Sequence, residues 1–482
     1  MAKSRNMTSV VMPELPKCPS GIQGLDEITF GGLPQGRPTL VCGGAGCGKT
    51  LLAMEFLCRG ALTYNEPGVF IAFEEKEKDL EENFSSLGFD LKKLVAQKKL
   101  LIDYVYIERS EIEETGEYDL EGLFVRLASA VDAIGAKRVV LDTIEALFSG
   151  FTNQSILRAE LRRLFRWLKD KGVTAIITGE KGESLLTKHG LEEYVADCVI
   201  FLDHRVNEQI ATRRLKIIKY RGSKHGTNEF PFLIGNSGIS VFPMTSLLLS
   251  SSVSSQRISS GIKGLDEMFG LKGYYQGTTI LVSGSAGSGK TSFGAQFVDS
   301  VCRSGQRALY FAFEESEGQL SRNMTSIGIN LKKWADKGIL KIVANRATLC
   351  GLEMHLVMAH KAVKEFKPAV VVIDPITTMI GSGIMDEARA MIARLLDFLK
   401  NEGITVLATD LTDKSGETEV GISSLCDTWI RLSMEMQDYK RIRRISIIKS
   451  RGMNHGHETK DLIFTNNGLE VKNIPGVRED YK

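Results

Sequence analysis

One eight-residue motif occurs twice and limits the possible folds of this chain more than any other feature. It has the form G-x-x-x-x-G-K-T and reads GGAGCGKT at 43–50 and GSAGSGKT at 284–291. Each copy follows a short apolar run and precedes a segment with helical spacing, which predicts strand, loop and helix. The loop N–H groups can then point at phosphate oxygens, and the helix N-terminus adds positive potential. A Gly-rich turn with a chance lysine is the alternative, and the duplication makes it negligible.

The residue types within each loop predict individual roles. Lys49 and Lys290 should reach the β and γ phosphates of a nucleotide, and the hydroxyls of Thr50 and Thr291 should take a magnesium ion. Cys47 could be an oxidation switch, although a small filler residue is the better interpretation. The remaining nucleotide contacts are expected from Gly43, Gly44, Ala45, Gly46, Cys47, Gly48 and Leu51 in the first loop, and from Gly284, Ser285, Ala286, Gly287, Ser288, Gly289 and Ser292 in the second.

The whole chain repeats with a period of about 240 residues, which is the size of a domain and not of a solenoid repeat. We therefore expect an N-terminal segment (1–18), a first domain (19–244), a Ser-rich linker (245–260) and a second domain with a short tail (261–482). Five segments recur in the same order: 21–27 with 261–267, 70–75 with 310–315, 138–142 with 370–374, 174–178 with 405–409, and 217–222 with 447–452.

Short, continuously apolar runs alternate with segments of helical spacing, for instance 156–171 and 387–402. This alternation predicts an α/β fold in which a mostly parallel sheet is flanked by helices on both faces. In such sheets ligands gather at the carboxyl ends of the strands. The phosphate loops fall at these ends, so the other functional side chains are expected there too.

Composition and charge bear on which classes of function the sequence supports. The 61 Lys and Arg residues nearly balance the 59 Asp and Glu residues, so nothing in the net charge supports a nucleic-acid partner. The eight cysteines form no C-x-x-C pair, which predicts reduced thiols in a cytoplasmic protein. No apolar run approaches the ~18 residues of a membrane span, and the first residues lack a signal-peptide core.

Acidic residues follow the apolar runs at two further places in each half. Asp142 and Asp374 end such runs and are predicted to hold the metal ion. The paired acids Glu74–Glu75 and Glu314–Glu315 are predicted to supply the catalytic base, with Glu314 also close to the metal. The sequence leaves open which acid of each pair faces the phosphate, and a solvated acidic turn is the alternative interpretation.

A K-x-R-G-x-x-H pattern follows a late strand in both halves. Late strands lie far from their own phosphate loop, so these cations are predicted to reach a nucleotide on a neighbouring subunit, as an arginine finger does. The consequence is a ring-shaped homo-oligomer, and a solvated basic turn is the alternative. The residues expected at the nucleotide are Lys219, Tyr220, Arg221, Ser223 and His225 in the first half, and Lys449, Ser450, Arg451, Met453 and His455 in the second.

These motifs, taken together, resemble the tandem RecA-like P-loop ATPases of the circadian clock protein KaiC family. The resemblance covers the chain from about Pro19 and is specific, because the G-[IL]-x-G-L-D-E, F-E-E and K-x-R-G segments occur twice in order. It implies a double-ring homohexamer that binds ATP and Mg²⁺ between subunits. It further implies slow ATP hydrolysis in the first domain, with autophosphorylation and autodephosphorylation in the second.

The resemblance also implies particular sites. The phosphorylated pair would be Ser423 and Ser424, with Thr418 as a further hydroxyl, and the first domain has Glu193 and Tyr194 at the matching place. The two strands around Ser423 and Ser424 would end at the nucleotide-binding edge or at the face toward a neighbouring subunit. Contacts with nucleotide are implied for Ser86, Ile327 and Arg443.

Partners and alternative functions follow from the same residues. The resemblance allows a KaiB-like regulator, while the short tail after Gly468 argues against a KaiA-like partner. One alternative function is a RecA- or DnaB-like DNA-dependent ATPase, for which 182–189 offers few basic residues. Another is a nucleotide-gated scaffold without kinase activity.

Overall fold

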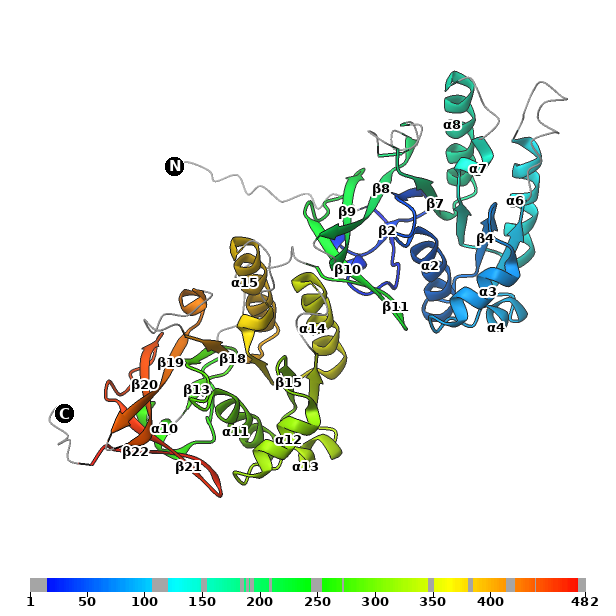
Figure 1. Cartoon of the computed structure of the whole chain (residues 1–482). Helices are drawn as coiled ribbons and strands as arrows, with labels where there is room; N and C mark the ends of the chain where they lie inside the picture. Colours follow the sequence, from blue (N-terminus) through cyan, green and yellow to red (C-terminus); the bar gives the residue numbers. More distant parts are fainter. Residues whose placement is uncertain are drawn as a thin grey trace, which may run out of the picture. The chain divides into compact units, whose positions relative to one another are not determined.

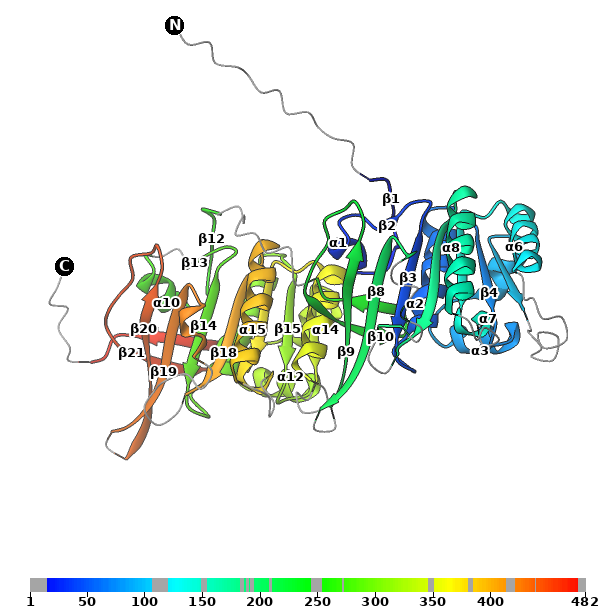
Figure 2. The same ribbon diagram turned by 90° about the horizontal axis from the view of Figure 1, so that it is seen from above.

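The computed structural model describes residues 15–105, 120–148, 154–182, 186–187, 190, 195–207, 210–243, 254–270, 273–345, 351–379, 385–412, 421–437 and 439–475. The chain divides into two compact units, Met1–Ser246 and Leu247–Lys482. Figures 1 and 2 show the same arrangement in each unit, a central sheet with helices packed against it.

The described part of the first unit contains a nine-stranded sheet with the order β11-β10-β9-β8-β3-β7-β6-β4-β5. The strands from β8 to β5 are parallel, whereas β9, β10 and β11 extend the sheet in antiparallel pairing. The bounds in chain order are β3 (Pro38–Gly43), β4 (Gly68–Ala72), β5 (Leu100–Tyr104), β6 (Arg138–Asp142), β7 (Thr174–Glu180), β8 (Cys198–Asn207), β9 (Ile210–Tyr220), β10 (Glu229–Gly235) and β11 (Gly238–Val241); a separate pair is formed by β1 (Lys17–Cys18) and β2 (Leu33–Pro34).

Helices cover both faces of this sheet because its strands are apolar on both sides. Along β3, Val41 packs into the core beneath α2, while Leu40 and Cys42 pack into the core beneath α6 and α8. The helices described in this unit are α1 (Leu25–Ile28), α2 (Lys49–Thr63), α3 (Glu77–Ser85), α4 (Leu91–Ala96), α6 (Glu121–Ile134), α7 (Glu145–Phe148) and α8 (Gln154–Asp170).

The second unit repeats this topology. Its described strands form a nine-stranded sheet with the order β16-β15-β17-β18-β14-β19-β20-β21-β22. The bounds are β12 (Arg257–Ile258), β13 (Tyr274–Tyr275), β14 (Thr279–Gly284), β15 (Ala308–Ala312), β16 (Leu340–Ala344), β17 (Val370–Asp374), β18 (Thr405–Leu411), β19 (Thr428–Gln437), β20 (Lys440–Ser450), β21 (Lys460–Thr465) and β22 (Gly468–Lys472). The helices are α10 (Lys263–Met268), α11 (Lys290–Arg303), α12 (Glu317–Thr325), α13 (Lys332–Asp336), α14 (Leu352–Phe366), η2 (Ile376–Met379), α15 (Met385–Asn401) and η3 (Ile422–Ser424).

These elements confirm the predicted α/β fold, and most segments lie where the sequence indicates. Strands β6 and β17 have the predicted bounds, and α8 and α15 cover the predicted helical segments. Strand β4 ends at Ala72, so the paired acids lie in a bend just beyond it. Arg257–Ile258, at the end of the predicted linker, pairs with β13 of the second unit. The exact domain limits remain a prediction.

The strand register separates two groups of predicted site residues. Each phosphate loop follows the carboxyl end of β3 or β14. Strands β9 and β20 run the other way, so Tyr220 pairs with Cys198, which itself pairs with Thr39 at the start of β3. A strand advances about 3.3 Å per residue, which places this edge roughly 13 Å along the strand from Gly43. The K-x-R-G segment therefore lies at the edge opposite its own phosphate loop.

Candidate nucleotide sites

Both phosphate loops have the backbone conformation that their glycines allow. Gly48 has φ of 104° and Gly289 has φ of 108°, in the left-handed region that favours glycine. In the first loop a Cβ at Gly48 would lie 3.1 Å from Ile234 of β10, whereas one at Gly44 would meet nothing within 4 Å. The loop is thus fixed against its own sheet on one side and open on the other, as a cradle for phosphate requires.

The loop lysines are buried at the base of this cradle. Lys49 Nζ donates to the carbonyls of Gly43 and Gly44, both at 3.0 Å. Lys290 Nζ donates to Gly284 at 2.8 Å and to Ser285 at 2.9 Å. Each ammonium group therefore lies against its loop, while Ala45, Gly46, Ser285, Ala286 and Gly287 are exposed at the crest.

Cys47 fits the filler interpretation. Its side chain is buried, and burial raises the pKa of its thiol, with the nearby Lys49 opposing that effect. Ser288 takes the same buried position in the second loop. The side chains of Leu51 and Ser292 are also buried, so the contacts predicted for these two residues would have to come from their backbone groups.

The predicted metal-binding aspartates lie beneath the loops and are fixed by hydroxyl groups. Asp142 accepts a hydrogen bond from Thr178, and Thr50 also hydrogen-bonds to it. Burial raises the pKa of Asp142, and the negative charges of Glu75 and Glu74 add to this rise. A cation between these groups would favour the ionised carboxylate.

The second unit repeats this arrangement, with a tyrosine hydroxyl as a further hydrogen-bond donor to the aspartate. Asp374 accepts hydrogen bonds from the Tyr310 hydroxyl at 2.7 Å and from Thr409. Thr291 lies partly buried in the first turn of α11. The side-chain atoms that could bind a metal here, on Asp374 and Thr291, are oxygens, which suits Mg²⁺. No cluster of three or more acidic, histidine or cysteine side chains that could hold a metal is found among the described residues, so phosphate and water oxygens would complete the coordination.

The paired acids point in different directions. Glu74 accepts a hydrogen bond from Thr143 at 2.9 Å, whereas Glu75 accepts one from Asn83 of α3 at 3.4 Å. In the second unit Glu315 accepts from Asn323 of α12 at 3.3 Å. Burial raises the pKa of Glu314, Asp374 raises it further, and Lys290 opposes these effects. Glu314 therefore faces the loop lysine and the aspartate, while Glu315 is bonded to α12.

The basic segment of the first unit lies at the opposite edge and is partly used within its own domain. Tyr220 is buried and its hydroxyl donates to Gly32 O at 2.9 Å, while His225 stacks on its ring. Arg221 is exposed and lies 3.8 Å from Asp197. Lys219 is half-buried, and the hydroxyl of Ser223 donates to a neighbouring carbonyl.

The basic segment of the second unit contacts the turn that carries the predicted phosphorylation sites. Lys449 Nζ donates to Ser423 O at 2.7 Å, and Arg451 Nη2 donates to Ser424 O at 2.9 Å. Ser424 is exposed and Ser423 half-buried. The structure thus brings Lys449, Arg451, Ser423 and Ser424 together, at the edge away from Lys290. Thr418, Glu193 and Tyr194 lie outside the described residues.

Three further predicted residues of this edge, Ser450, Met453 and His455, have partners within the unit. The Ser450 hydroxyl lies 3.0 Å from that of Thr428, and Arg257 donates to the Met453 sulfur at 2.7 Å. The His455 ring lies 4.9 Å from that of His457. These contacts thus hold the three side chains against residues of their own unit.

Three further residues are predicted to contact nucleotide. Arg443 lies at the second phosphate loop, whereas Ser86 and Ile327 lie in the turns after α3 and α12. Arg443 Nε donates to Gly287 O at 3.2 Å, and its guanidinium lies 4.6 Å from the Phe464 ring centroid. Ser86 directly follows α3, and its hydroxyl donates to Asn83 O. Ile327 lies in the matching turn after α12, where its carbonyl accepts from Gly468 N. Of these three, Arg443 is the one in contact with its phosphate loop.

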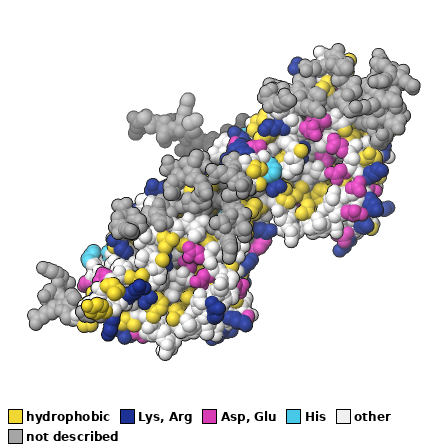
Figure 3. Space-filling view, in the orientation of Figure 1, with side chains coloured by type: hydrophobic (Ala, Val, Ile, Leu, Met, Phe, Trp, Pro, Cys, Tyr) yellow, Lys and Arg dark blue, Asp and Glu magenta, His cyan; other side chains and the backbone are white. Residues whose placement is uncertain are grey.

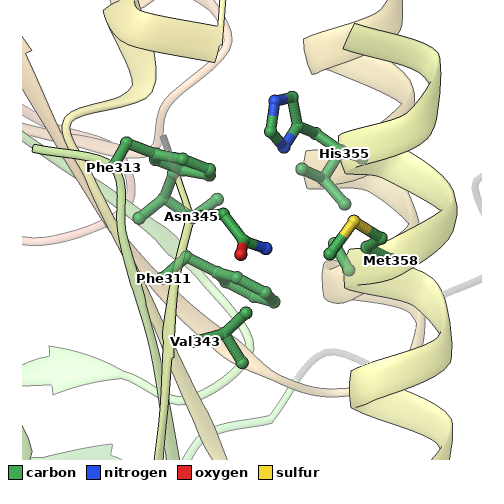
Figure 4. A pocket seen from close by; sticks show the side chains of 9 residues that line it. Phe311, Phe313, Val343, Asn345, His355 and Met358 are labelled. Atoms are coloured by element: carbon green, nitrogen blue, oxygen red, sulfur yellow. The ribbon is translucent and has the colours of Figure 1, made fainter. Parts of the chain in front are cut away.

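A pocket in the second unit lies away from this chemistry. Figure 4 shows Phe311, Phe313, Val343 and Asn345 on the sheet side, facing His355 and Met358 of α14. Its lining includes no phosphate-loop residue. Phe313 immediately precedes Glu314, so this packing supports the strand end that carries the acid.

Sequence reasoning missed several residues that position the site. Thr178 and Thr409 hold the aspartates, and Asn83 and Asn323 hold the second acid of each pair. Each pair occupies equivalent places in the two halves, so a complete comparison of the halves would have found them. Thr143 has no such counterpart, because Pro375 follows Asp374.

A phosphate loop after a parallel strand, a buried aspartate at the end of the second strand along the sheet and acids after the third define a RecA-like P-loop ATPase domain. The chain carries two such domains in tandem. The model of the KaiC ATPase family matches residues 18–246 and 258–475. The chain belongs to the KaiC family of ATPases.

Similar proteins support this assignment over nearly the whole chain. "Circadian clock protein KaiC2" of Synechocystis is 55% identical over 460 residues, covering 94% of this chain and 81% of that protein. "Circadian clock oscillator protein KaiC" of Prochlorococcus marinus subsp. pastoris is 35% identical and covers 98% and 93%. The protein of that name from Thermostichus vulcanus is 37% identical and covers 95% and 89%.

Two surface properties bear on partners. On the face seen in Figure 3, basic and acidic side chains are interspersed, which does not favour a polyanion. None of the helices that the structure describes is long and apolar enough to cross a membrane.

Proposed function

We propose that this chain is an ATP-hydrolysing autokinase that phosphorylates and dephosphorylates Ser423 and Ser424 in its second domain. The working form is a homohexamer with ATP at the subunit interfaces, and the phosphorylated state acts as a clock or signalling switch. Family membership and the names of the relatives support this function.

The observation that carries the proposal is the separation of two half-sites within one unit. Lys290 and Glu314 lie at the carboxyl edge of the second sheet, whereas Ser423, Ser424 and Arg451 lie at the opposite edge. A serine at that edge cannot meet the loop of its own domain. In a ring this separation is no obstacle, because the side of one subunit that carries Ser423 and Ser424 can meet the side of the next subunit that carries the phosphate loop.

ATP with Mg²⁺ supplies the phosphoryl group. Lys290 and the loop N–H groups hold the phosphates, while Thr291 and Asp374 are the candidate metal ligands. Glu314 accepts the serine proton, since it lies near Lys290 and Asp374 and its pKa is raised above the ordinary value, chiefly by burial. Lys449 and Arg451 of the subunit that offers the serine offset the charge that develops. In the first domain Glu74 plays the matching role toward water, with Asp142 at the metal and Lys219 and Arg221 supplied by the next subunit.

Partners and location complete the proposal. A KaiB-like regulator is compatible with the family, and a KaiA-like partner is not part of it. We place the protein in the cytoplasm, because none of the seven cysteines that the structure describes forms a disulfide and all seven are buried.

The test is incubation with γ-labelled ATP and Mg²⁺, followed by mass mapping of the phosphate. We expect label on Ser423, Ser424 or both, and expect Ser423→Ala with Ser424→Ala to abolish it while the hexamer persists. Label at the wild-type level in the double variant would move the site to another hydroxyl, with Thr418 next to be tested. Hydrolysis without any label would indicate a nucleotide-gated scaffold.

A further inference from the structure

Three cationic side chains surround the turn that carries Ser423 and Ser424. Arg389, from the first turns of α15, donates from Nη2 to the Ser424 hydroxyl at 3.0 Å. Lys449 and Arg451, from β20 and the turn after it, donate instead to the carbonyls of the two serines. Among the described side chains, Arg389 is thus the cation that reaches the hydroxyl itself.

Two of these cations, Lys449 and Arg451, lie close enough to affect one another. Burial lowers the pKa of Lys449, and the charge of Arg451 lowers it further. Asp427 opposes this effect, but its carboxylate is already bonded to Lys400 at 3.0 and 3.1 Å and to Thr279 N. An additional anion at this place would relieve the repulsion between the cations.

We propose that Arg389 binds the phosphate group of phosphorylated Ser424, and that Lys449 and Arg451 complete this anion site within the same subunit. The inference rests on the proposed function, since it concerns the product of the kinase reaction. A phosphoserine carries about −1.5 to −2 charges and three acceptor oxygens. A guanidinium group matches two of those oxygens in a fork, which an ammonium group cannot do.

The site makes the two serines unequal. Ser424 is exposed and its hydroxyl already contacts Arg389, whereas Ser423 is contacted through its carbonyl by Lys449. Phosphate on Ser424 is therefore held by a residue of its own chain and is removed more slowly than it would be without Arg389. Arg389 acts as a positioning residue for the modified state.

The first domain supplies a matched control. Arg158 has the same spacing from Lys169 as Arg389 has from Lys400. Each lysine pairs with the aspartate that immediately precedes β8 or β19, Asp197 or Asp427. Arg158 is exposed on α8, and the matching turn lacks a serine pair. Arg158→Gln therefore removes the same charge from the other domain.

The experiment compares wild type, Arg389→Gln, Arg389→Lys and Arg158→Gln in site-resolved phosphate occupancy after incubation with γ-labelled ATP. Glutamine can still donate a hydrogen bond to the hydroxyl but has no charge. We expect Arg389→Gln to reduce occupancy of Ser424 several-fold relative to Ser423, Arg389→Lys to retain an intermediate level, and Arg158→Gln to match wild type. Equal Ser424 to Ser423 ratios in wild type and Arg389→Gln would overturn the proposal.

A second arm separates this inference from the kinase assignment. Phosphoserine is introduced at position 424 by genetic encoding in the full chain, and its removal by an added serine phosphatase is timed. Removal should be several-fold faster in Arg389→Gln than with Arg389 present. Equal rates would refute the anion site even if the kinase reaction occurs. Absence of label in wild type, with a rate difference here, would refute the kinase and retain the anion site.

Discussion

Glu314 and Glu315 are adjacent in the chain but have different surroundings, and this difference could not be read from the sequence. Asn323 donates to Glu315 from α12, while Glu314 lies near Lys290 and Asp374. The F-E-E pattern predicted an acidic pair at the loop edge. Choosing between its members requires the direction in which the chain turns after β15, which depends on tertiary packing.

The first prediction assigns the base in each domain. Glu314→Gln should lower the rate of phosphate incorporation about a hundredfold or more, because a positioned base contributes roughly 10²–10⁴, while Glu315→Gln should have a smaller effect. Glu74→Gln with Glu75→Gln should instead lower ATP hydrolysis and leave incorporation largely intact. Equal effects of the changes in both domains on both measurements would contradict this division.

The second prediction concerns pH. Glu314 must be ionised to accept a proton, and its pKa is raised above the ordinary value, chiefly by burial. As pH falls, incorporation should therefore decline at a higher pH than it would for a glutamate with an ordinary pKa. Initial rates of label uptake across pH 4–8 measure this, with ATP binding followed as the control. If the rate of label uptake stayed constant as the pH was lowered to the ordinary pKa of glutamate, another group would have to accept the proton.

At the scale of elements, Asp427 is one of the residues that join the serine turn to the sheet. Asp427 accepts from Thr279 N at 3.0 Å and from Lys400, and its carbonyl accepts from Arg451 N at 2.9 Å. The same residue thus links η3, β14, α15 and the basic turn. Asp197 makes the corresponding contact with Lys169 in the first domain.

The third prediction follows from that link. Asp427→Ala leaves a backbone N–H and an ammonium group without their acceptor, which costs about 1–3 kcal/mol. We expect faster hydrogen exchange across 421–430 and reduced phosphate uptake, with first-domain ATP hydrolysis unchanged. Asp427→Asn should restore part of the protection, and Asp197→Ala serves as the matched control. Unchanged exchange in Asp427→Ala would show that the turn is held by other contacts.

The elements themselves were largely predictable. Apolar runs and helical spacing located β6, β17, α8 and α15, and the two G-x-x-x-x-G-K-T copies located the loops. The antiparallel direction of β9 and β20 was not predictable, because the hydrophobic pattern of a strand does not show in which direction the strand runs. Yet that direction places Lys219 and Lys449 at the far edge of each sheet, which is why we propose that they act at a site shared with another subunit.

At the scale of the whole molecule, both units carry complementary half-sites on opposite edges. If the half-sites meet in a ring, nucleotide should hold the subunits together. Native mass spectrometry with ATP and Mg²⁺ should show a six-subunit particle, and Arg221→Ala with Arg451→Ala should weaken it. A monomer under these conditions would contradict the shared-site arrangement.

The central claim is that the serines of one subunit receive phosphate from the loop of the next. Two chains of different mass are assembled together: one carries Lys290→Ala but keeps Ser423 and Ser424, and the other keeps Lys290 but carries Ser423→Ala and Ser424→Ala. Each alone should take up little γ-labelled phosphate. In mixed rings, label should appear on the Lys290→Ala chain. A mixed assembly in which that chain stays unlabelled, while wild-type rings are labelled, would contradict transfer between subunits.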